Sequence, residues 1–217
     1  PPGTAAAIVV LAGVNGAGKS SLLGAEIQNR TKNERLDYFN PDAWARSLRE
    51  TNPGLTVEEA NGLAWTPGKM RLQNAITSRT NFTFETTLGG NTIPSLLERA
   101  HDSGLAVRVW FVGLESPELH IARVKARVAA GGHDIPTAKI RERYERSRAN
   151  LIRLLPKLTA LRVFDNSAEG DPRTPGGPSP RLILSMNEGK IIEFCALEEV
   201  PDWAKPIVVA AFRTYSI

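Results

Sequence analysis

The sequence predicts an α/β fold in which a parallel five-stranded sheet lies between helices as a three-layer sandwich. Five short apolar or β-branched runs alternate with stretches long enough for crossover helices, and this alternation is typical of such a sheet. A glycine-rich motif follows the first run. The length of 217 residues, with 41% hydrophobic and 23% charged residues, suits one globular domain. We expect that domain to have its core at residues 6–166, a basic helical segment at about 116–150, and a C-terminal loop and hairpin at 170–217.

The first predicted strand, residues 6–11, leads directly into a complete phosphate-binding loop. Residues 13–20 match G-x-x-x-x-G-K-[ST] at every fixed position, and residues 21–27 can begin a helix. Glycines let backbone N–H groups converge on a phosphate, and the helix N-terminus adds positive potential. We expect Lys19 to reach the β- and γ-phosphates and the Ser20 hydroxyl to bind Mg²⁺. A glycine-rich turn that contains Lys-Ser by chance is the alternative, and the correct flanks disfavour it.

The motif therefore predicts a nucleoside triphosphate site, with ATP and Mg²⁺ as its ligands. The residues expected to contact the nucleotide are Gly13, Asn15, Gly16, Ala17, Gly18, Lys19, Ser20 and Ser21.

The second predicted strand, residues 36–39, is followed by Asn40, Pro41 and Asp42. In a parallel sheet, ligands bind at the carboxyl ends of the strands. Phosphoryl transfer to a hydroxyl needs a carboxylate that orients the hydroxyl and accepts its proton, and Asp42 is placed for this role. Asn and Asp beside Pro are also ordinary helix-capping residues. From position alone, capping and catalysis remain equally open for Asp42.

The third predicted strand, residues 82–85, ends in Glu85, Thr86 and Thr87, and helices are expected at 68–78 and 93–103 around it. Polar groups interrupt an apolar strand at the edge where chemistry is expected. Glu85 can bind substrate hydroxyls or a Mg²⁺ water, and either threonine can hydrogen-bond a substrate or a phosphate. The alternative is a solvated strand end that caps the next helix.

The basic segment follows the fourth predicted strand, residues 106–112. Residues 120–150 hold eight Lys or Arg against three acidic side chains, whereas the whole chain has a net charge of +4. Three explanations stay open: a nucleic-acid footprint, a solvated helix face, or a lid whose arginines close over a phosphate. We expect Gly131 and Gly132 to end one helix and Pro136 to begin the next, with His133 in the loop as a hydrogen-bonding or phosphate-contacting residue. Three dispersed histidines imply no metal site.

The C-terminal part carries less functional information. After the last predicted strand, residues 161–164, the stretch 170–180 is a surface loop by composition, and residues 181–186 and 190–194 predict a hairpin. Cys195, the single cysteine, is expected to be a small core residue rather than a catalytic thiol, and it fits a reducing compartment. The chain lacks a stretch of membrane-spanning length and the charge pattern of a signal peptide, so a cytoplasmic location is expected.

Several of these motifs together resemble the zeta-toxin family of P-loop kinases, particularly its short, single-domain members. The resemblance covers roughly residues 6–166. It rests on residues 13–20, Phe39-Asn40-Pro41-Asp42, the Phe-Glu-Thr-Thr core of 82–88, and residues 131–136 followed by 141–151. It implies a sheet order of 2-3-1-4-5 and ATP-dependent phosphorylation of the 3′-hydroxyl of the amino sugar in UDP-N-acetylglucosamine. It also implies a small antitoxin protein as partner, whereas nucleic acid and membrane are not expected partners.

The resemblance further assigns roles to single residues. It implies that Asp42 is the general base and that Glu85 and Thr87 are substrate-site residues. It implies that Arg127 clamps the phosphates, with Arg141 as the second clamp and His133 as its rival. The residues expected at the substrate are Asn40, Asp42, Glu85, Thr86, Thr87 and His133. Asn166 and Ser167 are placed to line an adenine pocket.

Two other functions remain open from the sequence. One is a kinase of the same fold that acts on another hydroxyl, such as a nucleotide, a nucleic-acid end or a metabolite. The other is a non-catalytic module in which ATP switches a binding surface, and it would leave Asp42 and Glu85 without a role.

Overall fold

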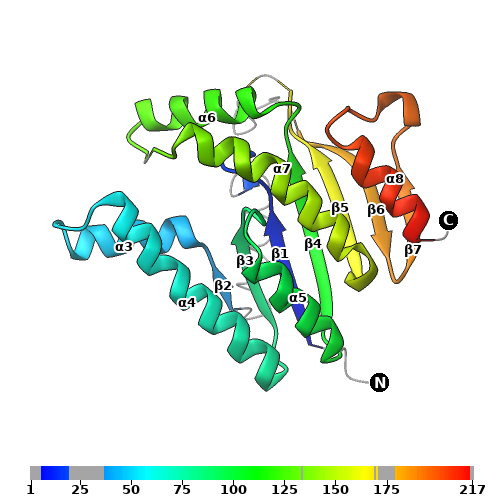
Figure 1. The fold of residues 1–217 in the computed structure, drawn as a ribbon, viewed down its shortest axis with the longest axis horizontal. Coiled ribbons are helices and arrows are strands. Elements are labelled where there is room, and N and C mark those ends of the chain that lie inside the picture. The colour runs from blue at the N-terminus through cyan, green and yellow to red at the C-terminus, as the bar shows by residue number, and fades with distance from the viewer. Residues whose placement is uncertain (1–5, 20–36, 133, 169, 171–178, 216–217) are drawn as a thin grey trace.

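A computed structural model describes residues 6–19, 37–132, 134–168, 170 and 179–215, and its centre is one mixed sheet of seven strands in the order β2-β3-β1-β4-β5-β6-β7 (Figure 1). The strands are β1 (Ala7–Ala12), β2 (Tyr38–Phe39), β3 (Phe82–Thr86), β4 (Ala106–Gly113), β5 (Ala160–Asp165), β6 (Arg181–Asn187) and β7 (Lys190–Phe194). The first five are parallel to one another, and their order matches the expected 2-3-1-4-5.

The expectation of a five-stranded parallel sheet was wrong in its extent. The C-terminal hairpin joins the same sheet, because β6 pairs antiparallel with β5, with Leu161 opposite Met186. Ile183, Leu184 and Met186 of β6 are at most 1% exposed, so the hairpin contributes to the core. The unpaired backbone groups of β5 explain the addition, because an open strand edge readily takes up another strand.

Helices cover the sheet on the side that faces the viewer in Figure 1, where α4, α5, α7 and α8 lie over it. The helices are α3 (Pro41–Thr51), α4 (Val57–Ser78), α5 (Thr92–Asp102), α6 (Pro117–Ala129), α7 (Thr137–Leu154) and α8 (Lys205–Thr214), with short 3₁₀ turns η1 (Leu155–Lys157) and η2 (Leu197–Glu199). The helix expected at residues 21–27 lies outside the described residues.

The core follows from the apolar parallel strands. Ile8, Val10, Val107, Val109 and Leu161 are fully buried on one face of the sheet, whereas Arg108 of β4 and Arg162 of β5 are exposed on the other face. Each such side chain contributes roughly 1.5–3 kcal/mol through burial. Cys195 is partly buried and packs against this core, as the sequence suggested.

Helix α4 begins at Val57, well before the expected start at residue 68. Thr56 caps it in a capping box, because Glu59 N donates to the Thr56 hydroxyl oxygen over 3.2 Å and Thr56 N donates to the Glu59 carboxylate over 2.9 Å. The helix then continues through Pro67. The expected helix at 68–78 therefore covers only the second half of α4, whose start signal lies at Thr56.

The loop after β3 is fixed by a side chain from α7. Leu88 has a φ of +55°, which is uncommon for a non-glycine residue. The buried Asn150 side chain donates to the Leu88 carbonyl oxygen over 2.8 Å and to the Gly90 carbonyl oxygen over 3.0 Å. One amide therefore holds the segment that carries Thr86 and Thr87.

We predict that Asn150→Ala lowers the free energy of unfolding by about 1–3 kcal/mol, because the buried Leu88 carbonyl group and the partly buried Gly90 carbonyl group lose their donor. Chemical denaturation measures this change. Asn91→Ala is the matched control, because Asn91 lies at the exposed start of α5 without a side-chain capping bond, and its effect should stay below about 0.5 kcal/mol. Equal effects of the two substitutions would contradict the role given to Asn150.

Candidate active site

The carboxyl ends of the parallel strands bring the predicted site residues to one edge of the sheet. β1, β3 and β2 are neighbours, with Leu11 opposite Glu85 and Phe39 opposite Phe84. The segments that follow these strands carry the loop at 13–19, Asn40 with Asp42, and Thr86 with Thr87. Ligands of open α/β sheets bind at this edge.

The loop at 13–19 requires glycine at two of its positions. Gly13 has a φ of +146°, and a side-chain carbon there would lie 2.3 Å from the Val112 carbonyl oxygen at the end of β4. Gly16 has a φ of +84°, and a side-chain carbon there would lie 2.8 Å from the His120 carbonyl oxygen in α6. The loop is thus pressed against β4 and α6, and its shape fits the phosphate cradle that the motif predicts.

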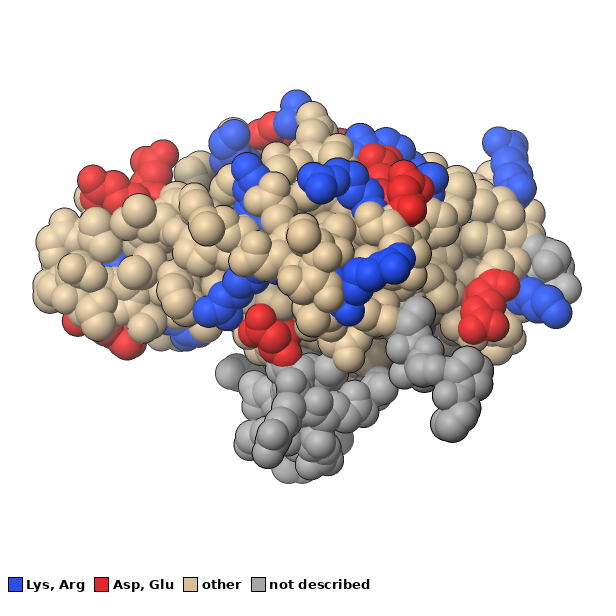
Figure 2. Space-filling view, turned by 90° about the horizontal axis from the view of Figure 1, so that it is seen from below, with Lys and Arg blue, Asp and Glu red and all other residues tan. Residues whose placement is uncertain are grey.

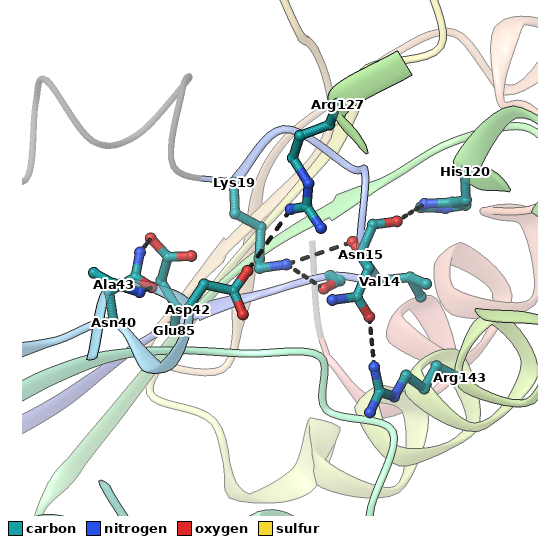
Figure 3. Close-up of polar contacts among 11 residues, drawn as sticks. Val14, Asn15, Lys19, Asn40, Asp42, Ala43, Glu85, His120, Arg127 and Arg143 are labelled. Atoms are coloured by element: carbon teal, nitrogen blue, oxygen red, sulfur yellow. Dashed lines mark hydrogen bonds and ion pairs between the residues drawn. The ribbon is translucent and has the colours of Figure 1, made fainter. Parts of the chain in front are cut away.

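Lys19 lies at the mouth of this loop. Its Nζ donates to the Gly13 carbonyl oxygen over 2.7 Å and to the Val14 carbonyl oxygen over 3.4 Å (Figure 3). Loss of solvation lowers the pKa of Lys19, whereas the nearby carboxylates of Glu85 and Asp42 oppose this shift. The ammonium is therefore held beside two carboxylates at the sheet edge.

Asn40, and not Asp42, caps helix α3. Its side-chain oxygen accepts from Ala43 N over 3.0 Å, which is an N-cap bond. Asp42 lies in the first turn of α3, about half exposed, and its Oδ2 is 3.8 Å from Arg127 Nη1 in α6. The capping role that the sequence left open for Asp42 thus falls to its neighbour, and the Asp42 carboxylate points across the site (Figure 3).

Glu85 is buried, with 6% of its surface exposed, so it is not a solvated strand end. Its Oε1 accepts from the Tyr38 hydroxyl over 2.5 Å and from Asn40 Nδ2 over 3.0 Å. Burial, followed by the Glu85 charge, raises the pKa of Tyr38, so the phenol remains a donor to Glu85. Asn40 therefore links the cap of α3 to the buried carboxylate of β3.

Thr86 and Thr87 both use their hydroxyl oxygens locally. Thr86 Oγ1 accepts from Leu88 N over 3.0 Å, and Thr87 Oγ1 accepts from Gly89 N over 3.4 Å. The backbone carbonyl of Thr86 accepts from Gly13 N over 3.2 Å, which ties this segment to the start of the phosphate loop.

The basic segment forms α6 and α7, joined by residues 130–136, and two of its arginines approach the loop. Arg127 of α6 meets Asp42, and Arg143 of α7 donates through Nη1 to Asn15 Oδ1 over 2.7 Å. Burial lowers the pKa of Arg143, and the Asp42 charge opposes the shift. The structure does not bring Arg141 to the loop, because Arg141 Nη1 pairs with Glu118 over 2.5 Å on the exposed surface.

Helix geometry explains why Arg143 rather than Arg141 faces the site. Positions two apart on a helix lie on nearly opposite faces. Ile140 and Ser147 are buried, and Arg143 shares their face at spacings of three and four. Arg143 was not among the predicted site residues, although the apolar spacing of Ile140, Tyr144 and Leu151 along α7 is a sequence signal for the face that it shares.

Two further side chains hold the loop from behind. Asn166, expected near an adenine pocket, donates to the Ala17 carbonyl oxygen over 2.9 Å and is itself buried. Its neighbour Ser167 accepts from Glu115 N over 2.8 Å. His120, which the sequence did not single out, lies 2.9 Å through Nδ1 from the Asn15 carbonyl oxygen.

Ser20, Ser21 and His133 lie outside the described residues, so their expected roles stay predictions. Within the described part of the chain, no group of three or more His, Cys, Asp or Glu side chains could hold a metal ion. The same residues include no helix that is long and apolar enough to cross a membrane.

The remaining charges of the basic segment are mostly paired at the surface. Arg146 pairs with Glu142 over 2.8 Å, and Arg148 pairs with Glu145 over 2.5 Å. On the face shown in Figure 2, Lys and Arg are spread among Asp and Glu and do not merge into one basic patch. This view is taken from below Figure 1, whereas α6 lies at the top of Figure 1, so Figure 2 does not show the face that α6 presents.

Solved structures with this fold include a chain of the AvrRxo1-ORF1:AvrRxo1-ORF2 complex, determined with sulphate ions and also with ATP. The TM-scores are 0.64 and 0.63 at 16% identity, over 96% of this chain, which spans 64% of that chain's length. A chain of the PezAT toxin–antitoxin system of Streptococcus pneumoniae aligns with a TM-score of 0.54 at 14% identity, over 76% of this chain and 68% of that one. These likenesses establish the fold.

Sequence relatives are consistent with that fold. An uncharacterized protein of Haemophilus influenzae is 31% identical over 132 residues, which are 61% of this chain and 88% of that protein. The family model of the Zeta toxin matches residues 1–169, which include the loop, Asp42, Glu85 and most of the basic segment. The chain therefore belongs to the Zeta toxin family.

Proposed function

We propose that this protein is an ATP-dependent phosphotransferase whose acceptor is the 3′-hydroxyl of the amino sugar in UDP-N-acetylglucosamine. The observation that carries the proposal is the convergence of Lys19, Asp42 and Arg127 at the mouth of a phosphate loop. Arg127 Nη1 lies 3.8 Å from Asp42 Oδ2, and the charges of Asp42 and Arg127 both act on Lys19. A phosphate cradle, a carboxylate and an arginine at one point are the parts that phosphoryl transfer needs.

The nucleotide half of the site consists of the loop and two arginines. The loop N–H groups and Lys19 bind the β- and γ-phosphates, and Arg127 and Arg143 neutralise the charge that spreads over the transferring group. Both arginines come from the basic segment, so that segment acts as a lid over the nucleotide. Mg²⁺ bound with ATP neutralises phosphate charge, and Ser20 is the residue of the motif expected to hold it.

The acceptor half consists of Asp42 and the polar group around Glu85. Asp42 is the general base: it orients the sugar hydroxyl and takes its proton as the γ-phosphoryl group bonds to the oxygen and leaves ADP. Glu85, fixed by Tyr38 and Asn40, presents a buried carboxylate that suits sugar hydroxyls, and Thr87 lies beside it on the same strand end. Membership of the Zeta toxin family supports the sugar nucleotide as acceptor.

The structural neighbours also suggest a protein partner. Structural neighbours were solved as the AvrRxo1-ORF1:AvrRxo1-ORF2 complex and from the PezAT toxin–antitoxin system. We therefore propose a small antitoxin protein that blocks the mouth of the site.

The test of the reaction is Asp42→Asn. This variant should bind ATP nearly normally yet transfer phosphate about 10²–10⁴-fold more slowly, because the hydroxyl loses its proton acceptor. Mass spectrometry of UDP-N-acetylglucosamine incubated with ATP reports the transfer. Asp37→Asn is the matched control, because Asp37 precedes β2 and its exposed carboxylate pairs with Arg71 over 3.5 Å. Unchanged transfer by Asp42→Asn, or phosphate on another acceptor in a hydroxyl panel, would favour a kinase of different specificity.

The second test separates Arg143 from Arg141. Arg143→Ala should lower the transfer rate by about 10³–10⁵, the range for an arginine that stabilises transition-state charge. Arg146→Ala on the same helix, with 58% of its side chain exposed, should have no effect. A larger loss of transfer rate in Arg141→Ala than in Arg143→Ala would show that Arg141, and not Arg143, contacts the phosphate.

A further inference from the structure

We propose that His120 is a positioning residue that orients the Asn15–Gly16 peptide so that Gly16 N–H points toward the bound phosphate. The inference rests on the proposed nucleotide site and goes beyond it, because His120 belongs to neither the loop nor the reacting groups. It lies in the first turns of α6, behind the loop.

The contact with the Asn15 carbonyl determines which nitrogen of the His120 ring carries the proton. His120 Nδ1 lies 2.9 Å from the Asn15 carbonyl oxygen, and His120 is 1% exposed. A carbonyl oxygen only accepts hydrogen bonds, so Nδ1 must carry the proton. His120 Nε2 is then the unprotonated nitrogen, which agrees with its having no hydrogen-bond partner among the described residues.

Because the peptide between Asn15 and Gly16 is planar, the contact to Asn15 O also sets the direction of Gly16 N–H. In a trans peptide, the carbonyl of one residue and the N–H of the next point in opposite directions. Asn15 O points toward His120, so Gly16 N–H points away from His120. Figure 3 shows His120 and Lys19 on opposite sides of the Asn15 main chain, so this N–H is directed to the side from which Lys19 would meet a phosphate.

Packing prevents the ring from following a displaced loop. The His120 ring meets the Tyr144 ring edge-on, with centroids 5.6 Å apart, and Tyr144 OH donates to the Glu115 carbonyl oxygen over 2.9 Å. The His120 backbone lies against Gly16, which leaves no room for a side chain there. The ring therefore acts as a fixed donor.

The charge state of the His120 ring is that of a fixed hydrogen-bond donor and does not suit a proton-transfer role. Burial lowers the pKa of His120 to about 4; the hydrogen bond to Asn15 opposes the shift, and the positive charges of Lys19 and Arg123 add to it. The ring is thus neutral near pH 7. The Asn15 side chain has a separate donor in Arg143, so substitution of His120 isolates the main-chain contact.

The test compares His120→Asn with His120→Leu. The two side chains have the same branching and both lose the ring contact with Tyr144, but only Asn keeps an N–H donor at the δ position. Isothermal titration calorimetry with MgADP measures binding of the β-phosphate, and thermal unfolding checks the fold of each variant. His120→Leu should lose about tenfold in affinity relative to His120→Asn, which is the scale of one buried hydrogen bond.

Equal affinities of the two folded variants would overturn the inference. Absence of MgADP binding by the wild-type protein would instead overturn the proposed function. A second measurement does not depend on any variant: nitrogen-15 NMR of the wild-type protein should show the imidazole proton on Nδ1 of His120 at pH 7. A proton on Nε2 would contradict the inference, even if His120→Leu does not fold.

Discussion

The fixed backbone of the loop at 13–19 is the constraint on which the rest of the structure depends. The end of β4 and the first turns of α6 leave no room for side chains at Gly13 and Gly16. Asn166 and His120 then hold the Ala17 and Asn15 carbonyl groups from behind. With the Asn15 carbonyl group bound by His120, the N–H group of Gly16 in the same peptide points away from His120. In the phosphate site that we propose, a loop held in this way needs no reorganisation when the anion binds.

The same constraint explains the balance of charge at the sheet edge. Lys19 and Arg143 bring positive charge to a partly buried region, where loss of solvation disfavours their charged forms. Asp42 and Glu85 offset that cost for Lys19. In the mechanism proposed here, an arriving γ-phosphate competes with Asp42 for Arg127, so nucleotide binding and release of the base become linked. Catalysis then rests mainly on positioning and charge stabilisation.

Much of the fold could be predicted from the sequence, because strand and loop signals there are local. The five parallel strands and their order followed from apolar runs and from the resemblance carried by the loop, Asp42 and Glu85. The pairing of β6 with β5 could not be predicted, since a hairpin signal is local and its docking depends on a distant open edge. For the site, the loop itself fixed the placement of Lys19, whereas Arg143 and His120 depend on the rotation and packing of α6 and α7. A choice between Arg141 and Arg143 needs the buried face of α7, which becomes visible only when Ile140 and Ser147 are treated as one stripe.

The most direct measurement is a crystal structure of the complex with MgADP, a planar fluoride mimic of the γ-phosphoryl group, and UDP-N-acetylglucosamine. We expect the β-phosphate within hydrogen-bond distance of Gly16 N and Lys19 Nζ, and Arg127 and Arg143 in contact with the mimic. We expect an Asp42 carboxylate oxygen about 2.6–3.2 Å from the sugar 3′-hydroxyl. A nucleotide bound away from the loop, or an acceptor hydroxyl out of reach of Asp42 with Arg143 turned from the mimic, would contradict the proposed mechanism.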